Sequence, residues 1–264
     1  MRTIASEIQP RCPVLSSIII IFTVVCLSPL VLSFSSARAQ AKEKKLSTRA
    51  GYVSTSHDIT SQMTGEDREL RPGSSVKRAN FKKVGRSSAA QKFADWIVDS
   101  EDNSGMPFVL VDKVDARVFV FASDGQLRGS APALLGLARG DDSVPGIGDR
   151  PLSAIRPEQR TTPAGRFVGL LGHNADGSNV LWIDHEKAVS LHRVITDDPR
   201  ERRLQRLASP TPLDNRISYG CINVPVNFFD DVVRPVLANT RGVIYVLPET
   251  RSNREIFESY YEVE

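Results

Sequence analysis

A single short segment carries the residues best suited to chemistry: Arg216-Ile217-Ser218-Tyr219-Gly220-Cys221-Ile222-Asn223-Val224-Pro225. Gly220 allows a tight backbone turn whose N–H groups can point at one spot. If the helix expected after the segment begins near Cys221, its positive end favours the thiolate. A thiol nucleophile needs a lowered pKa and donors for an oxyanion, and both features are offered here. The alternative is a buried structural cysteine, because free cysteines are often buried.

Such a nucleophile needs a base, and the chain has four histidines. His57 lies in a polar stretch, while His173 and His185 lie in or near expected turns. His192 instead ends an apolar run, 188–191, which predicts a strand that fixes the imidazole. A lone histidine on a strand is more often structural, but its combination with a lone cysteine predicts a Cys–His pair.

The N-terminal residues, 1–39, have the three parts of a secretory signal. Arg2 and Arg11 give a positive start, an apolar stretch covers 14–34, and Ala37-Arg38-Ala39 offers a cleavage site. The alternative is an uncleaved membrane anchor, since the apolar stretch is long enough to span a bilayer. Either interpretation places the protein in the periplasm or at the cell surface, with membrane contact only through this segment if it stays uncleaved.

Export makes the cysteine count informative. Two of the three cysteines, Cys12 and Cys26, fall inside the predicted signal, so the mature chain keeps Cys221 alone. That thiol has no partner for an intramolecular disulfide, and a zinc site built on cysteines is excluded. We expect no metal and no organic cofactor, because a thiol and an imidazole suffice for acyl transfer.

Composition changes along the rest of the chain. Residues 40–88 are rich in Lys, Arg, Ser, Gly and Thr, which predicts a basic flexible linker. Its charges also suit anionic cell-envelope polymers, although they are scattered and partly balanced. The net charge of the whole chain is only +3, which does not favour a nucleic-acid partner.

The remaining residues predict a mostly β domain. A short helix is expected within 89–104, followed by a domain at 105–250 and a tail or short helix at 251–264. β-rich runs bounded by turn residues predict strands at 108–112, 116–121, 166–171, 180–184, 188–194 and 242–247. One helix is expected at about 226–236.

The segment Ser218-Tyr219-Gly220-Cys221-Ile222-Asn223 resembles the catalytic signature of the L,D-transpeptidases, the YkuD-like domain. Two further matches lie in the right order. The stretch 161–167 is similar to a Thr-Pro-x-Gly-x-Phe loop of that family, and 107–136 is similar to the start of its domain. The resemblance covers roughly residues 105–249.

This resemblance implies a β-sandwich with a few short helices and a cysteine that attacks a carbonyl of a peptidoglycan stem peptide. Cys221 then matches the nucleophile and His192 the upstream base. The amides of Gly220 and its neighbour match the oxyanion donors, with Tyr219 beside them. The flanking polar positions are Ser218 and Asn223, and Arg216 is expected to line the substrate cleft.

Three features depart from the family pattern. Tyr219 replaces a histidine before Gly-Cys, and a tyrosine hydroxyl cannot replace imidazole as a base near neutrality. Arg193 stands where the family usually has glycine. The gap from His192 to Ser218 is about ten residues longer than expected and contains a charged loop.

These features together predict an exported L,D-transpeptidase-like cysteine acyltransferase that forms peptidoglycan cross-links through a thioester on Cys221. One alternative keeps the same chemistry but passes the acyl group to water, which makes the protein a hydrolase. Another is a non-catalytic peptidoglycan-binding protein on the same fold. Retention of Cys221 and His192 argues against loss of catalysis, while Tyr219 argues mildly for it.

Overall fold

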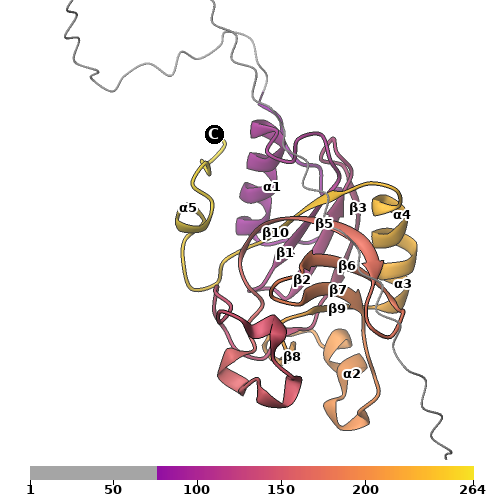
Figure 1. Ribbon diagram of the computed structural model, residues 1–264. Helices are drawn as coiled ribbons and strands as arrows, with labels where there is room; N and C mark the ends of the chain where they lie inside the picture. The colour runs from indigo at the N-terminus through magenta and orange to yellow at the C-terminus, as the bar shows by residue number, and fades with distance from the viewer. Residues whose placement is uncertain (1–75) are drawn as a thin grey trace, which may run out of the picture. The chain divides into compact units, whose positions relative to one another are not determined.

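The structure is a computed structural model that describes residues 76–264 (Figure 1). The predicted signal, 1–39, and the first part of the predicted linker, 40–75, lie outside the described residues. The strands are β1 (Phe108–Asp112), β2 (Arg117–Phe121), β3 (Leu127–Pro132), β4 (Leu135–Gly136), β5 (Gly165–His173), β6 (Asn179–Asp184), β7 (Val189–Arg193), β8 (Arg216–Ser218), β9 (Ile222–Val224) and β10 (Gly242–Val246).

Helices are few and short. They are α1 (Ser88–Ser100), α2 (Arg203–Ala208), α3 (Val226–Phe228), the π-helical turn η6 (Phe229–Val233), α4 (Arg234–Leu237) and α5 (Asn253–Ile256), with 3-10 turns η1 (Ile147–Asp149), η2 (Leu152–Ala154), η3 (Pro157–Gln159), η4 (Pro199–Glu201) and η5 (Pro212–Asp214). The predicted mostly β class is therefore confirmed, as are the six predicted strands and the helix expected near 226–236. None of the helices among residues 76–264 has the length and apolar character needed to cross a bilayer.

Eight of the strands form one mixed sheet in the order β3-β2-β1-β10-β5-β6-β7-β9. The pairs β1–β10 and β7–β9 are parallel, and the other neighbours are antiparallel. The remaining two strands, β4 and β8, pair with each other in parallel. The parallel β7–β9 pair places His192 opposite Asn223 and so brings the predicted base beside the cysteine segment.

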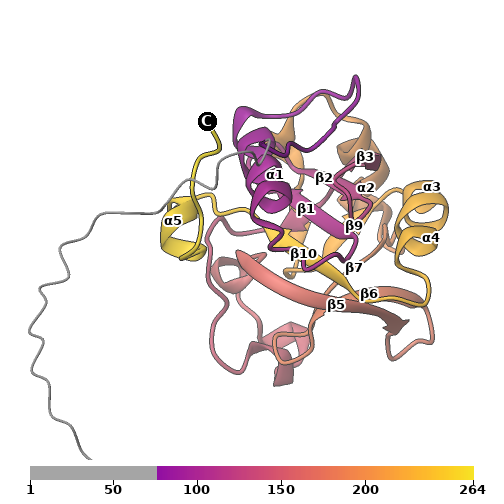
Figure 2. The same cartoon turned by 90° about the horizontal axis from the view of Figure 1, so that it is seen from above.

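The sheet curls so that its two halves face each other. Alternate residues of a strand point to opposite faces, and in β1 both faces are buried. Val109 and Val111 enter a core that also contains residues of β6, β7 and β9, whereas Phe108 and Leu110 enter a second core with α1. Burial between the two halves makes the domain sandwich-like, and α1 covers the other face of β1 (Figure 2).

The second core also takes in the two ends of the described chain. Ser87 caps α1 by accepting a hydrogen bond from the Ala90 amide, and Phe81, only 2% exposed, packs edge-on against Phe119 and Phe121. The predicted linker, 40–88, is thus wrong at its end, because its last residues belong to the folded domain. The C-terminal segment packs there too, through Phe257 and Tyr260.

Candidate active site

Cys221 lies in the tight turn between β8 and β9. Gly220, the residue before it, has φ +134°, a backbone conformation that side chains rarely adopt. A Cβ at this position would lie 2.8 Å from the carbonyl oxygen of Thr161, so the turn requires glycine. A strand, β9, follows Cys221, and the helical residues begin only at Val226. The expected helix dipole therefore does not act on the thiol, and its activation has another source.

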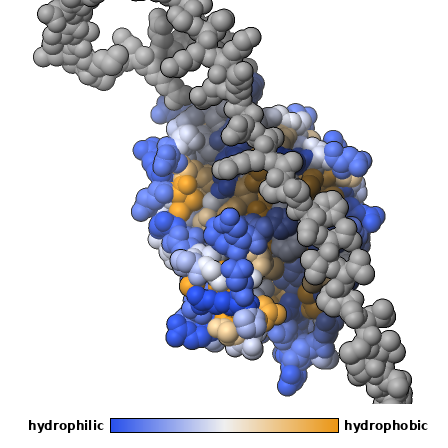
Figure 3. Space-filling view, viewed as in Figure 1, coloured by the Kyte–Doolittle hydropathy of each residue, from blue (hydrophilic) through white to orange (hydrophobic). Residues whose placement is uncertain are grey.

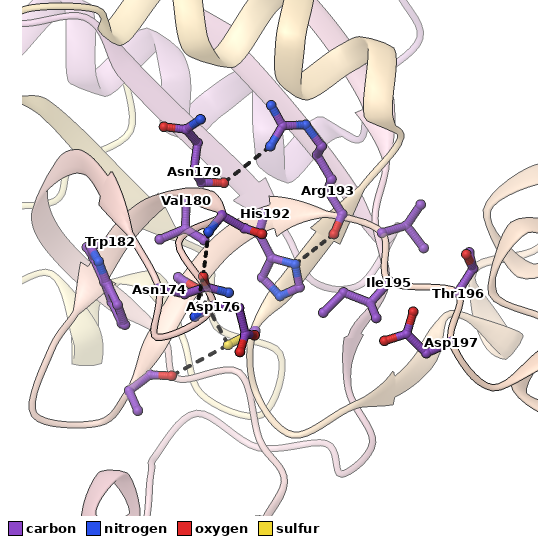
Figure 4. Close-up of a pocket in the computed structure, with 15 residues that line it drawn as sticks. Asn174, Asp176, Asn179, Val180, Trp182, His192, Arg193, Ile195, Thr196 and Asp197 are labelled. Carbon is purple, nitrogen blue, oxygen red and sulfur yellow. Dashed lines mark hydrogen bonds between the residues drawn. The ribbon is translucent and has the colours of Figure 1, made fainter.

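That source is a set of groups that line an open cavity of about 510 Å³, part of which is seen in Figure 4. The half-buried Sγ of Cys221 lies 3.7 Å from the Ser190 hydroxyl and 3.5 Å from the carbonyl oxygen of Ala188. His192 lines the same cavity, one alternation along β7 from Ser190. The structure thus brings the predicted nucleophile and the predicted base into one pocket.

The orientation of His192 fixes the role of each ring nitrogen. Nδ1 lies 2.7 Å from the carbonyl oxygen of Arg193 (Figure 4). A carbonyl oxygen only accepts, so Nδ1 carries the hydrogen and donates it. In the neutral ring Nε2 then holds the free lone pair, which is the form needed to take a proton from a thiol.

Burial raises the pKa of the Cys221 thiol, but its neighbours have the larger effect. A hydrogen bond from His192 and the charge of its imidazolium form lower the pKa, and hydrogen bonds from Ser190 lower it further. The resulting pKa of Cys221 lies below its ordinary value, which increases the fraction of the nucleophilic thiolate near neutral pH.

Polar neighbours hold the cysteine turn. The Ser218 hydroxyl donates to the Cys221 carbonyl oxygen at 2.6 Å and accepts from the Gly220 amide at 3.1 Å. The Asn223 amide nitrogen lies 3.4 Å from the same Cys221 carbonyl oxygen. Because the N–H of Gly220 is already engaged, the structure does not support its predicted role as an oxyanion donor.

Two of the predicted residues face other partners. The ring of Tyr219 lies beneath the guanidinium of Arg160, whose central carbon is 3.9 Å from the ring centroid. Arg216 was expected to line the substrate cleft, but it is not among the residues that line this cavity. It forms an ion pair with Glu249 and donates to the carbonyl oxygen of Lys113 at 2.9 Å. Its charge is thus neutralised by Glu249 away from this cavity.

Two residues of the site were missed in the sequence. Ser190 is the first, and its signal was available, since residues two apart on a strand share a face and His192 was already singled out. Thr162 is the second: its hydroxyl donates to the Gly220 carbonyl oxygen and accepts from the Gly136 amide, both at 2.9 Å. Such a contact between positions 58 residues apart has no local signal.

The other histidines of the described chain are not candidates for the base. His185 stacks on Trp182 with ring centroids 4.3 Å apart, and His173 ends β5 with an exposed side chain. Within residues 76–264 there is also no group of three or more His, Cys, Asp or Glu residues placed to hold a metal ion.

A half-buried cysteine and a tautomer-fixed histidine line one cavity of a curled β domain, where they form a candidate nucleophile and base. Neither a family model nor a curated protein matches the chain. Similar solved structures include the helical cell shape determining protein Pgp2 from Campylobacter jejuni, with 18% identity over 56% of this chain and a TM-score of 0.35. The chain spans about half of Pgp2, since the match covers 49% of that protein.

Two other similar structures are named as L,D-transpeptidases. The catalytic domain from E. faecium shares 20% identity over 53% of this chain and 96% of its own, with a TM-score of 0.31. The enzyme from Xylanimonas cellulosilytica DSM 15894 shares 14% over 53% and 60%, with a TM-score of 0.32. These two structures carry the name of the family whose motifs the sequence resembles.

Proposed function

We propose that the protein is an exported cysteine acyltransferase that forms peptidoglycan cross-links through a thioester on Cys221, as an L,D-transpeptidase does. The observation that supports this most strongly is the Cys221–His192 pair, open to a cavity and with the pKa of the thiol lowered. The carbonyl partner of Nδ1 leaves Nε2 of His192 free to act as the base.

The proposed reaction begins with proton transfer from Cys221 Sγ to His192 Nε2. The thiolate attacks a stem-peptide carbonyl, and the oxyanion is stabilised by the backbone amide of Cys221, since that of Gly220 is engaged. Collapse of the intermediate breaks the peptide bond, and His192 returns the proton to the leaving amine. A thioester on Cys221 remains.

The second half of the reaction releases the acyl group. An acceptor amine attacks the thioester, His192 takes its proton, and an amide forms as the thiolate leaves. Water in place of the amine gives hydrolysis by the same steps, so both outcomes share one site.

Charges in the cavity suit an amine. Two exposed carboxylates, those of Asp176 and Asp197, line it (Figure 4). The guanidinium of Arg193 also lines it but is paired with Asp230. An excess of negative charge attracts cationic groups, which favours an ammonium-bearing stem peptide over an anionic one.

The test is incubation of the purified protein with muropeptides and analysis of the products by mass spectrometry. A cross-linked dimer establishes transfer, and a shortened stem peptide establishes hydrolysis. Neither product from a folded protein would contradict the catalytic proposal and favour a binding protein. Export, which the pattern of residues 1–39 supports, is tested separately by sequencing the N-terminus of the protein recovered from the cell envelope.

A further inference from the structure

The connection between β7 and β8 contains the charged loop that lengthens the interval between His192 and Ser218. It carries η4, the helix α2 and η5 (Figure 1). Its hydrophobic contact with the domain is small and consists of Leu207 of α2, which packs with Leu134 and Val194 in a minor cluster. Arg206 also fastens the connection by donating to the carbonyl oxygens of Glu201 and Asp214. Arg206 therefore closes the connection on itself, while Leu207 packs it against the domain.

Arg203, the first residue of α2, reaches out of the connection to the cysteine segment. Its side chain is only 11% exposed. Nε donates to the Glu201 carboxylate at 2.6 Å, and Nη1 donates to the Asn223 side-chain oxygen at 2.7 Å. The fork of the guanidinium thus ties a carboxylate of its own connection to the residue two positions after the nucleophile.

This contact decides which way the Asn223 amide faces. A guanidinium only donates, so the oxygen of the amide must face Arg203. The NH₂ group then faces the Cys221 carbonyl oxygen, 3.4 Å away. Because Asn223 is 1% exposed, no solvent competes for these positions.

The Cys221 carbonyl oxygen consequently has donors from two sides, the Asn223 amide and the Ser218 hydroxyl. Fixing this oxygen restrains the peptide plane that follows Cys221, and so the backbone from which the Cys221 side chain projects. We propose that Arg203 is a positioning residue, which holds the Cys221 thiol at His192 through the orientation of Asn223. Only its effect on turnover rests on the proposed acyl transfer, since thiol reactivity is measurable without any wall peptide.

The test is the rate of Cys221 alkylation by iodoacetamide across pH, in the full-length protein. Arg203→Met keeps the apolar stem and removes both donors. We expect alkylation at pH 7 to slow about tenfold, with the apparent pKa of Cys221 moving up towards its unperturbed ~8.5, because the thiol is displaced from His192. Arg203→Lys keeps the charge on a single donating nitrogen in place of the planar fork, and we expect a smaller loss of about threefold.

Arg200→Met is the matched control, because Arg200 lies in the same connection, its side chain is 91% exposed, and its guanidinium pairs with Asp198. Its alkylation profile should equal that of the wild type. A wild-type profile in both Arg203 variants would overturn the proposal, and so would an equal loss in Arg200→Met. Should Arg203→Met fail to fold, Arg203→Lys decides: a slower rate supports the proposal and a wild-type rate overturns it.

Turnover separates this proposal from the proposed function. If Arg203→Met alkylates slowly while even the wild type leaves muropeptides unchanged, the positioning role stands and the acyl transfer fails. If the wild type turns over and Arg203→Met loses kcat by about tenfold at unchanged KM, both stand. Loss of turnover with an unchanged alkylation profile contradicts the positioning role alone.

Discussion

Two clusters of polar residues adjoin the cysteine turn, and they differ in their exposure: one is closed and the other opens onto a cavity. In the first, the Lys113 ammonium has no exposed surface and donates to Asp141 at 2.7 Å and to the Gly140 and Thr162 carbonyl oxygens at 2.6 and 3.0 Å. Glu249 pairs with Arg216 beside it. In the second, Cys221 and His192 open onto a cavity.

The difference shows which groups are available for chemistry. Every donor of the Lys113 ammonium is engaged, so this closed cluster fastens loops and offers nothing to a substrate. His192 keeps one ring nitrogen free, and the Cys221 thiol is half-buried at the cavity. The two clusters meet at Thr162, which accepts from Lys113 and donates to Gly220. The closed cluster thus supports the turn that carries the open one.

The face of the domain seen in Figure 3 is mostly hydrophilic, with apolar residues in scattered spots. Solitary apolar residues on a surface are ordinary in soluble domains. The difference between the closed and the open cluster therefore says more about function than the surface hydropathy does, and it can be tested directly.

Substitution of the nucleophile should give the largest effect, because it removes turnover at the open cluster and leaves the stabilising contacts of the closed cluster in place. In Cys221→Ser we expect a loss of at least about 10³-fold in kcat/KM for muropeptides, since a serine hydroxyl has no strong base to ionise it. The free energy of unfolding should hardly change. Steady-state kinetics and urea unfolding test both parts, and retained turnover would contradict the assignment.

Removal of the base should come next. In His192→Gln the hydrogen bond and the charge that lower the pKa of Cys221 are lost, while burial still raises it. We expect the apparent pKa from iodoacetamide alkylation to rise and kcat/KM to fall about 10² to 10⁴-fold. His185→Gln, which removes a histidine stacked on Trp182, is the control and should alkylate like the wild type.

Breaking the closed cluster should affect stability before reactivity. Lys113→Met leaves the buried Asp141 carboxylate without its nearer cation, and we expect the free energy of unfolding to fall by about 3–5 kcal/mol. Lys92→Met breaks an exposed pair with Glu262 and should change stability little. Urea unfolding of the two variants side by side measures the difference, and equal effects would contradict the account.

Acid should weaken the closed cluster in a defined direction. Burial raises the pKa of Asp141, but bonds from Lys113, Thr250 and backbone amides outweigh it and hold the pKa well below its usual range. The folded-state pKa is thus below the unfolded value of about 3.9, so this stabilisation is complete above pH ~4 and declines as pH falls towards the folded pKa. The free energy of unfolding should fall less between pH 5 and 3 in Asp141→Asn than in the wild type. An equal fall would contradict the assignment of this pH dependence to Asp141.

The smallest effect is expected at Tyr219. Tyr219→Phe keeps the ring beneath Arg160, so the loss should not exceed about 1 kcal/mol, or about fivefold in kcat/KM. The wild type should be active with tyrosine at this position, so that the Tyr219→His substitution is not required for activity. Kinetics of both variants on one muropeptide decide the matter, because activity that appeared only in the histidine variant would indicate a decayed site.

The sequence predicted six of the ten described strands, because their β-rich runs are bounded by turn residues, as 108–112 and 242–247 illustrate. The short strands β3, β4, β8 and β9 were not predicted. Prediction failed where long-range contacts decide. The burial of Phe81 depends on Phe119 and Phe121 in a distant strand, and the pairing of Arg216 depends on Glu249, 33 residues away. Neither partner leaves a local pattern, so the end of the linker was misjudged and the pairing of Arg216 was not predicted.

The residues of the site also divide into those that the local sequence predicts and those that long-range contacts determine. Cys221 and His192 were predictable from their types and settings, and the parallel β7–β9 pair places them in one cavity. The groups that orient them, Thr162 and Arg203, were not predictable. Thr162 reaches the cysteine segment through its hydrogen bond to Gly220, and Arg203 through its hydrogen bond to Asn223. Only the folded chain defines these contacts.

The most direct test of the central claim is the intact mass of the protein after brief incubation with a tetrapeptide-bearing muropeptide. We predict a covalent adduct on Cys221 whose mass equals the acyl donor minus its leaving amine, and which hydroxylamine removes, as expected of a thioester. Cys221→Ser should show no such thioester. A folded wild-type protein with a reactive thiol, but with no adduct and no product, would contradict the assignment of Cys221 as an acyl-transfer nucleophile.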